Sequence, residues 1–69
     1  MTLAEIKLAA KLPPVQVWID GQTVQAYVRP GKLCPYPVVV IHWRGDIECR
    51  RFTWEAIERA INRKEVLYA

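Results

Sequence analysis

The sequence lacks any long hydrophobic run. Apolar stretches such as Val38–Ile41 are short, whereas a membrane-spanning helix needs about 20 consecutive apolar residues. Near the N-terminus, Glu5 and Lys7 interrupt the apolar residues and no small-residue cleavage site follows, which is unlike a secretory signal. We therefore expect a cytoplasmic protein that does not associate with a membrane.

Residues for catalysis and metal binding are also scarce. The chain has one histidine, His42, and two cysteines, Cys34 and Cys49. Their spacing includes no C-x-x-C or H-x-x-x-H pair of the kind that fixes zinc geometry. His42 would meet Glu48 or Cys49 only in certain strand registers, and no third residue accompanies the pair to orient a catalytic base. We expect no enzyme activity, no metal site and no cofactor.

The few glycines argue against a phosphate-binding loop, and the few cysteines argue against a protein stabilised by disulfides. In Arg29–Lys32, one glycine stands beside a proline, so this loop cannot supply a run of backbone N–H groups to cradle a phosphate. Two cysteines allow one disulfide between Cys34 and Cys49. In a chain without an export signal we expect free thiols in a reducing compartment instead.

What the chain does contain is the composition of a small globular protein. Its 69 residues are 52% hydrophobic and 25% charged, with a net charge of +3, values that are ordinary for soluble domains. This length allows a single domain, residues 1–69. The excess charge is spread along the chain and favours polyanions only modestly. So short a chain gains little net stability from its own core, which makes a homodimer an open alternative.

Two amphipathic segments predict helices near the two ends of the chain. Thr2-Leu3-Ala4-Glu5 matches the capping box, and apolar residues then recur at helical spacing, so we expect a helix over about 2–11 that ends before Pro13-Pro14. Thr53 is a good N-cap for a second helix over about 54–64. Beyond it, Val66–Tyr68 is expected to dock as a short extended tail.

Four further segments predict two β-hairpins in series. Alternating apolar residues indicate strands over 15–19 and 24–28, joined by a type I′ turn at Asp20-Gly21 or a type II′ turn at Gly21-Gln22. Val38–Ile41 is apolar on both faces, which is typical of a strand covered on two sides. A turn at Arg44–Asp46 then leads into an edge strand over 47–52. We predict an α+β fold of order α-β-β-β-β-α, with a four-stranded antiparallel sheet and two helices packed on one face.

The sheet face away from the helices carries many of the candidate binding residues. Alternation places Trp18, Tyr27 and Arg29 opposite the apolar set. Three tryptophans and three tyrosines exceed what so small a core can bury, and aromatic residues beside arginine are typical of interface hot spots. The predicted partner-binding residues are Trp18, Tyr27, Arg29, Lys32, Tyr36, Trp43, Arg44, Arg50 and Arg51.

These observations favour a non-enzymatic macromolecule-binding protein. We expect a small regulator or inhibitor that binds and occludes a larger protein or ribonucleoprotein. Its size and lack of catalytic residues fit small inhibitors from phages and other mobile elements, such as anti-CRISPR proteins. The alternative is a small basic nucleic-acid-binding protein that stacks bases on an aromatic sheet face and contacts phosphates through arginine.

Overall fold

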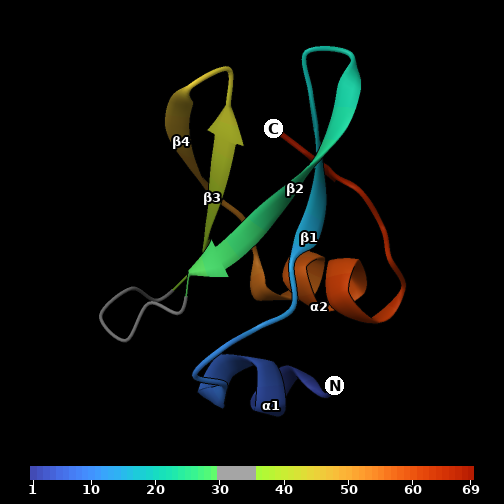
Figure 1. The fold of residues 1–69 in the computed structure, drawn as a ribbon. Coiled ribbons are helices and arrows are strands. Elements are labelled where there is room, and N and C mark those ends of the chain that lie inside the picture. The colour runs from blue at the N-terminus through green and yellow to red at the C-terminus, as the bar shows by residue number, and fades with distance from the viewer. Residues whose placement is uncertain (30–35) are drawn as a thin grey trace.

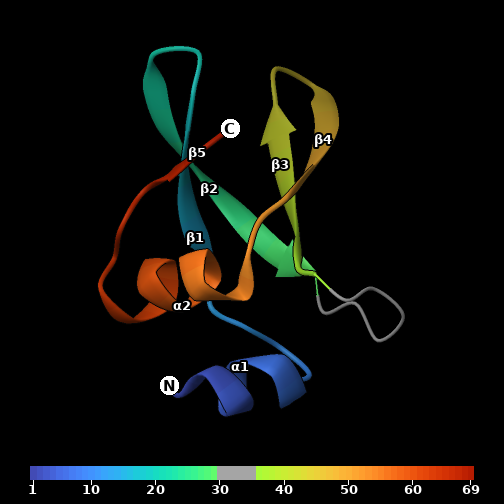
Figure 2. The ribbon, with the colours of Figure 1, turned by 180° about the vertical axis from the view of Figure 1, so that it is seen from behind.

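The computed structural model describes residues 1–29 and 36–69. In chain order, the elements are α1 (Leu3–Leu8), β1 (Val15–Ile19), β2 (Gln22–Arg29), β3 (Val38–Trp43), β4 (Asp46–Arg51), α2 (Trp54–Asn62) and β5 (Leu67–Tyr68). The strands form one sheet in the order β4-β3-β2-β1-β5. Both helices lie away from the tips of the two hairpins (Figures 1 and 2). The predicted α+β class is confirmed.

Helix α1 begins at the predicted capping box and ends earlier than predicted. The Thr2 hydroxyl accepts a hydrogen bond from the Glu5 backbone N–H at 3.2 Å, and the Glu5 carboxylate accepts one from the Thr2 backbone N–H at 3.0 Å. The helix does not reach residue 11, because Ala9 is already extended (φ −68°, ψ 135°). The extended path carries Leu12 into the core, and burying this side chain stabilises the fold more than a further helical turn would.

The first hairpin joins β1 to β2 through a type I′ turn. Asp20 (φ 50°) and Gly21 (φ 80°) both have left-handed backbone conformations, which selects one of the two predicted turns. The resulting antiparallel register pairs Val17 with Val24. The apolar residues of both strands therefore face the same side of the sheet, as predicted.

The second hairpin has the same turn, at Arg44 (φ 51°) and Gly45 (φ 82°), between β3 and β4. Val39 and Ile41 of β3 are buried, whereas Val38 and Val40, on the other face, are only half-buried. The expectation that Val38–Ile41 is covered on both sides is therefore wrong for the described part of the chain. The reason is that the buried residues of both helices pack on the Val39 and Ile41 side.

Helix α2 is capped at its N-terminus by Thr53, whose hydroxyl accepts a hydrogen bond from the Ala56 backbone N–H at 3.1 Å. It ends at Asn62, two residues before the predicted end at residue 64. Lys64 has a left-handed backbone (φ 60°), a conformation that terminates helices. The chain thereby turns back toward the sheet.

The returning chain forms a fifth strand that the prediction of a four-stranded sheet missed. Strand β5 lies parallel to β1 and pairs Leu67 with Val17 and Tyr68 with Trp18. The Ala69 backbone N–H extends the pairing by donating to the Trp18 carbonyl at 3.3 Å. A two-residue strand has too little sequence to show periodicity, so the pattern indicated only an extended tail.

The core lies between the two helices and one face of the sheet. The strands contribute Val15, Val17, Ala26, Val28, Val39, Ile41 and Leu67, and the helices contribute Ile6, Ile57, Ala60 and Ile61. No buried side-chain nitrogen or oxygen within the described residues lacks a hydrogen-bond partner. In the same part of the chain, neither helix is long and apolar enough to span a bilayer.

Candidate functional site

The sheet face opposite the core, here called the open face, is the candidate site. Side chains alternate between the two faces of each strand, so the neighbours of the buried residues lie on the open face. Its members are Gln16, Trp18, Thr23, Gln25, Tyr27, Arg29, Val38, Val40, His42, Ile47, Cys49, Arg51 and Tyr68. Among the described residues, this face has two arginines and no carboxylate. The face is therefore positive as well as partly apolar.

Its centre is an apolar patch formed by Tyr27, Val38, Val40, Ile47 and Cys49. Val40 of β3 pairs with Tyr27 on one side and with Cys49 on the other, and paired side chains have Cβ atoms about 5 Å apart. Tyr27 is 57% exposed and Ile47 is 65% exposed, while Cys49 is an exposed free thiol. Exposed apolar side chains that adjoin one another across strands are typical of interaction surfaces.

Two arginines border this patch at one end of the open face. Val38 pairs with Arg29 of β2 and Arg51 of β4, so one cation lies on each side of it. The Arg51 guanidinium lies 4.5 Å from the centre of the Tyr36 ring. Such stacking holds an arginine in place while leaving its N–H donors able to bind a carboxylate or phosphate.

Two aromatic residues lie near the other end of the open face. Trp18 is 44% exposed and pairs with Tyr68, which is 73% exposed. The pairing exists only because β5 joins the sheet. The sequence indicates Tyr68 as a candidate anchor, an aromatic residue in the tail, although it is not in the set of predicted binding residues. Ile47 was missed, although alternation places it on the same face as Cys49.

The structure places three of the predicted binding residues away from the open face. Trp43 packs against the core as a half-buried residue. Arg44, in the second turn, forms an ion pair with Asp20 at 2.8 Å and lies over the Trp43 ring. Arg50 projects from the opposite face of β4. Lys32 lies outside the described residues.

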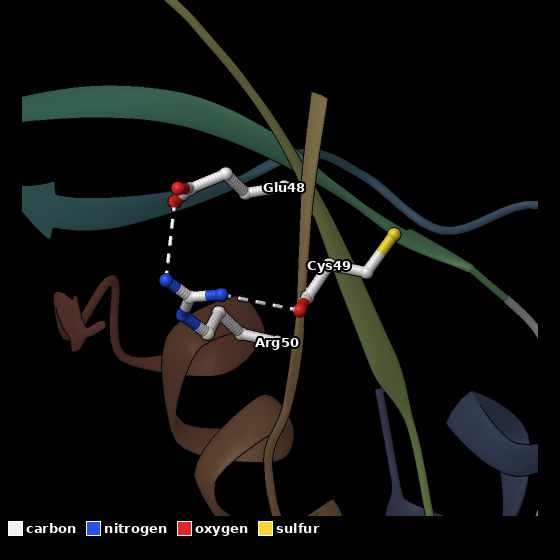
Figure 3. Close-up of polar contacts among 3 residues, drawn as sticks. All are labelled: Glu48, Cys49 and Arg50. Atoms are coloured by element: carbon white, nitrogen blue, oxygen red, sulfur yellow. Dashed lines mark hydrogen bonds and ion pairs between the residues drawn. The ribbon is translucent and has the colours of Figure 1, made fainter. Parts of the chain in front are cut away.

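Arg50 is held by its own strand. Its guanidinium forms an ion pair with Glu48 at 3.3 Å and donates to the Cys49 carbonyl at 3.5 Å. In Figure 3 the Cys49 thiol points away from both of these side chains, as alternation requires. The open face therefore holds Trp18, Tyr27, Arg29 and Arg51 of the predicted set, with Tyr36 stacked at its border.

The residues considered for catalysis are not brought together. His42 pairs with Ile47, and Glu48 pairs with Ile41, so neither Glu48 nor Cys49 lies directly opposite the histidine. In residues 1–29 and 36–69, no cluster of three metal-ligating side chains occurs. A pocket beside Pro13 and Pro14 has a volume of about 180 Å³, below the roughly 300–1,000 Å³ of common ligand sites.

No protein-family model matches the chain, and comparisons with curated proteins and with solved structures also find no match.

Proposed function

We propose that the protein is a non-enzymatic binding module that docks a protein or ribonucleoprotein partner on its open face. The observation that supports this is the apolar patch, in which half-buried Val40 pairs with exposed Tyr27 and exposed Cys49, and exposed Ile47 lies next to Cys49 on the same face of β4. Arg29 and Arg51 at its border favour a partner with carboxylates around an apolar contact. By covering part of a larger molecule, such a module would act as a regulator or inhibitor.

Both the composition and the placement of the patch support a protein partner. Aromatic and arginine side chains contribute most of the binding energy in protein interfaces, and their centres are depleted of charge. Here the charged residues lie at the border, and the centre contains valine, isoleucine and tyrosine. An exposed free thiol at Cys49 is typical of a reducing compartment, which supports a cytoplasmic location. That the protein is an inhibitor from a phage or another mobile element stays a prediction, which rests on the small size of the chain and its lack of catalytic residues.

A second candidate function is nucleic-acid binding. It is favoured by three exposed aromatic rings, those of Trp18, Tyr27 and Tyr68, on a face without carboxylates in the described chain. Bases stack on such rings, and arginines contact phosphates. The apolar patch is harder to reconcile with this function, because valine and isoleucine offer bases no stacking surface.

The experiment that tests the proposed function is a comparison of matched baits in lysate from the native host. The wild-type protein is immobilised beside Tyr27→Ala and the control Leu8→Ala, which removes an 86%-exposed side chain from α1. Each bait is used with and without nuclease, and affinities are then measured with the purified partner. We expect a protein that survives nuclease and binds Tyr27→Ala roughly 30-fold more weakly than wild type or Leu8→Ala.

Two outcomes would overturn the proposal. One is equal binding to the Tyr27→Ala and Leu8→Ala baits, since the contact would then lie elsewhere. The other is recovery of nucleic acid without any stoichiometric protein. In that case, changing Arg29 and Arg51 to alanine should flatten the salt dependence of binding, as expected for phosphate contacts.

A further inference from the structure

Within residues 1–29 and 36–69, strand β4 has one edge that pairs with no other strand. It is the outermost strand of the sheet next to β3, and over Asp46–Arg51 it has no proline or glycine. The Phe52 backbone N–H donates to the Pro37 carbonyl at 3.2 Å, and successive residues of a strand direct their backbone groups to opposite sides. The N–H and C=O groups of Glu48 and Arg50 therefore face β3, and those of Ile47, Cys49 and Arg51 face the free edge.

This geometry restricts how a second copy can add to the edge. A two-fold axis makes the two β4 strands antiparallel and self-complementary. Only residues with outward backbone groups can exchange hydrogen bonds, so Ile47, Cys49 and Arg51 must pair among themselves. Paired residues share a face of the sheet, so every such register also continues the open face from one subunit into the other.

Charge then distinguishes the remaining registers. An axis through Glu48 would place that carboxylate opposite Glu48 of the partner subunit, and an axis through Arg50 would oppose two arginines. Like charges opposite each other destabilise a strand pair. An axis through Cys49 instead places Glu48 opposite Arg50 of the partner subunit, and the symmetry repeats this pair. The existing ion pair at 3.3 Å would thereby join an alternating cluster of four charges (Figure 3).

We propose that the protein forms a homodimer by antiparallel pairing of β4 with β4 about a two-fold axis through Cys49. The Cys49 N–H and C=O exchange hydrogen bonds with those of Cys49 of the partner subunit. Ile47 pairs with Arg51 of the partner subunit, whose aliphatic stem covers it. Charged side chains commonly protect edge strands from pairing, but Glu48 and Arg50 have opposite signs and so complement each other in this register. The inference does not depend on the partner proposed above.

The register can be tested by reversing charges on β4 and measuring the dimer dissociation constant of the purified full chain by sedimentation equilibrium. We expect Glu48→Arg and Arg50→Glu each to weaken dimerisation roughly tenfold or more, because each replaces two opposite-charge pairs with like-charge pairs. Mixing the two variants should give a heterodimer, and the double swap in one chain should restore wild-type dimerisation. The control is Glu55→Arg, which makes the same charge change as Glu48→Arg at an exposed position of α2. Circular dichroism checks that every variant folds.

Crosslinking provides a second test in a Cys34→Ser background. In a hydrogen-bonded antiparallel pair the two Cα atoms lie about 5.5 Å apart, so a short bismaleimide should join the two Cys49 thiols efficiently. The matched control moves the thiol with Cys49→Ser and Ile47→Cys. In the proposed register, position 47 is opposite Arg51 of the partner subunit, so the two positions 47 are offset by about four residues along the strand, roughly 13 Å. This variant should therefore crosslink poorly. A protein that is monomeric at all concentrations, a dimer indifferent to charge reversal, or better crosslinking from position 47 would each overturn the proposal.

Discussion

Exposure divides the apolar side chains of this protein into two groups with different roles. Ile57 of α2 is fully buried among the strand residues, whereas Leu8 of α1 is almost fully exposed. We expect Ile57→Ala to lower the free energy of unfolding by about 2–5 kcal/mol, through lost burial and the cavity that remains. Urea denaturation followed by circular dichroism measures this change. Leu8→Ala, the control, should stay within about 0.5 kcal/mol of wild type, and a similar loss in both variants would contradict the assignment of the core.

A second residue-scale prediction concerns the pH dependence of the α1 cap. The hydrogen bond from the Thr2 backbone, followed by that with the Thr2 side chain, lowers the pKa of Glu5 below its ordinary value of 4.5. Because the folded pKa is the lower one, the ionised carboxylate stabilises the fold above about pH 4.5, and this contribution is lost as the pH falls through the folded pKa. An NMR titration of the Glu5 carboxyl should show the lowered pKa, and Thr2→Ala should return it toward 4.5. Identical titrations would show that the Thr2 side chain does not contribute to the lowered pKa.

The turns set the geometry of the sheet at the scale of the element. Both hairpins use two residues with positive φ, and Gly45 has φ 82°. A Cβ atom at Gly45 would meet nothing within 4 Å, so any cost of Gly45→Ala comes from backbone conformation alone. We expect a loss of roughly 1 kcal/mol in the free energy of unfolding, measured by urea denaturation. Gly45→Asn should cost less, since asparagine tolerates this conformation better. An alanine variant as stable as wild type would contradict the turn assignment.

At the scale of the whole molecule, the two faces of the sheet divide stability from binding. The inward face packs on both helices, while the open face carries the apolar patch, Arg29 and Arg51. Pairing at the β4 edge would join two open faces and would link folding to association. The thermal midpoint of wild type should therefore rise with protein concentration, because a dimer is stabilised by mass action. Differential scanning calorimetry over a concentration series measures this, and Glu48→Arg should lose most of the dependence. A midpoint independent of concentration in wild type would argue against the dimer.

Local sequence patterns alone determined most of the elements and the two faces of the first hairpin. The capping box at Thr2, the turn residues at Asp20-Gly21 and the alternation through Tyr27 and Val28 act over a few neighbouring residues, so they can be recognised without the fold. The placement of Trp18, Tyr27 and Arg29 on one face followed from the same alternation. The ends of the two helices could not be predicted in this way. They depend on the burial of Leu12 in the core and on the left-handed backbone of Lys64, and both of these are set by contacts with distant parts of the chain.

Only the tertiary structure decided how distant segments meet. It placed β5 beside β1, so that Tyr68 joins Trp18, and it left Val40 uncovered on the open face although its strand is apolar on both sides. It also packed Trp43 against the core, away from the predicted binding face, since the helices cover that side of β3. Arg50 lies on the opposite face from Arg51, as alternation along 47–52 already indicated. Such pairings depend on contacts between residues far apart in the chain, and local periodicity does not predict those contacts.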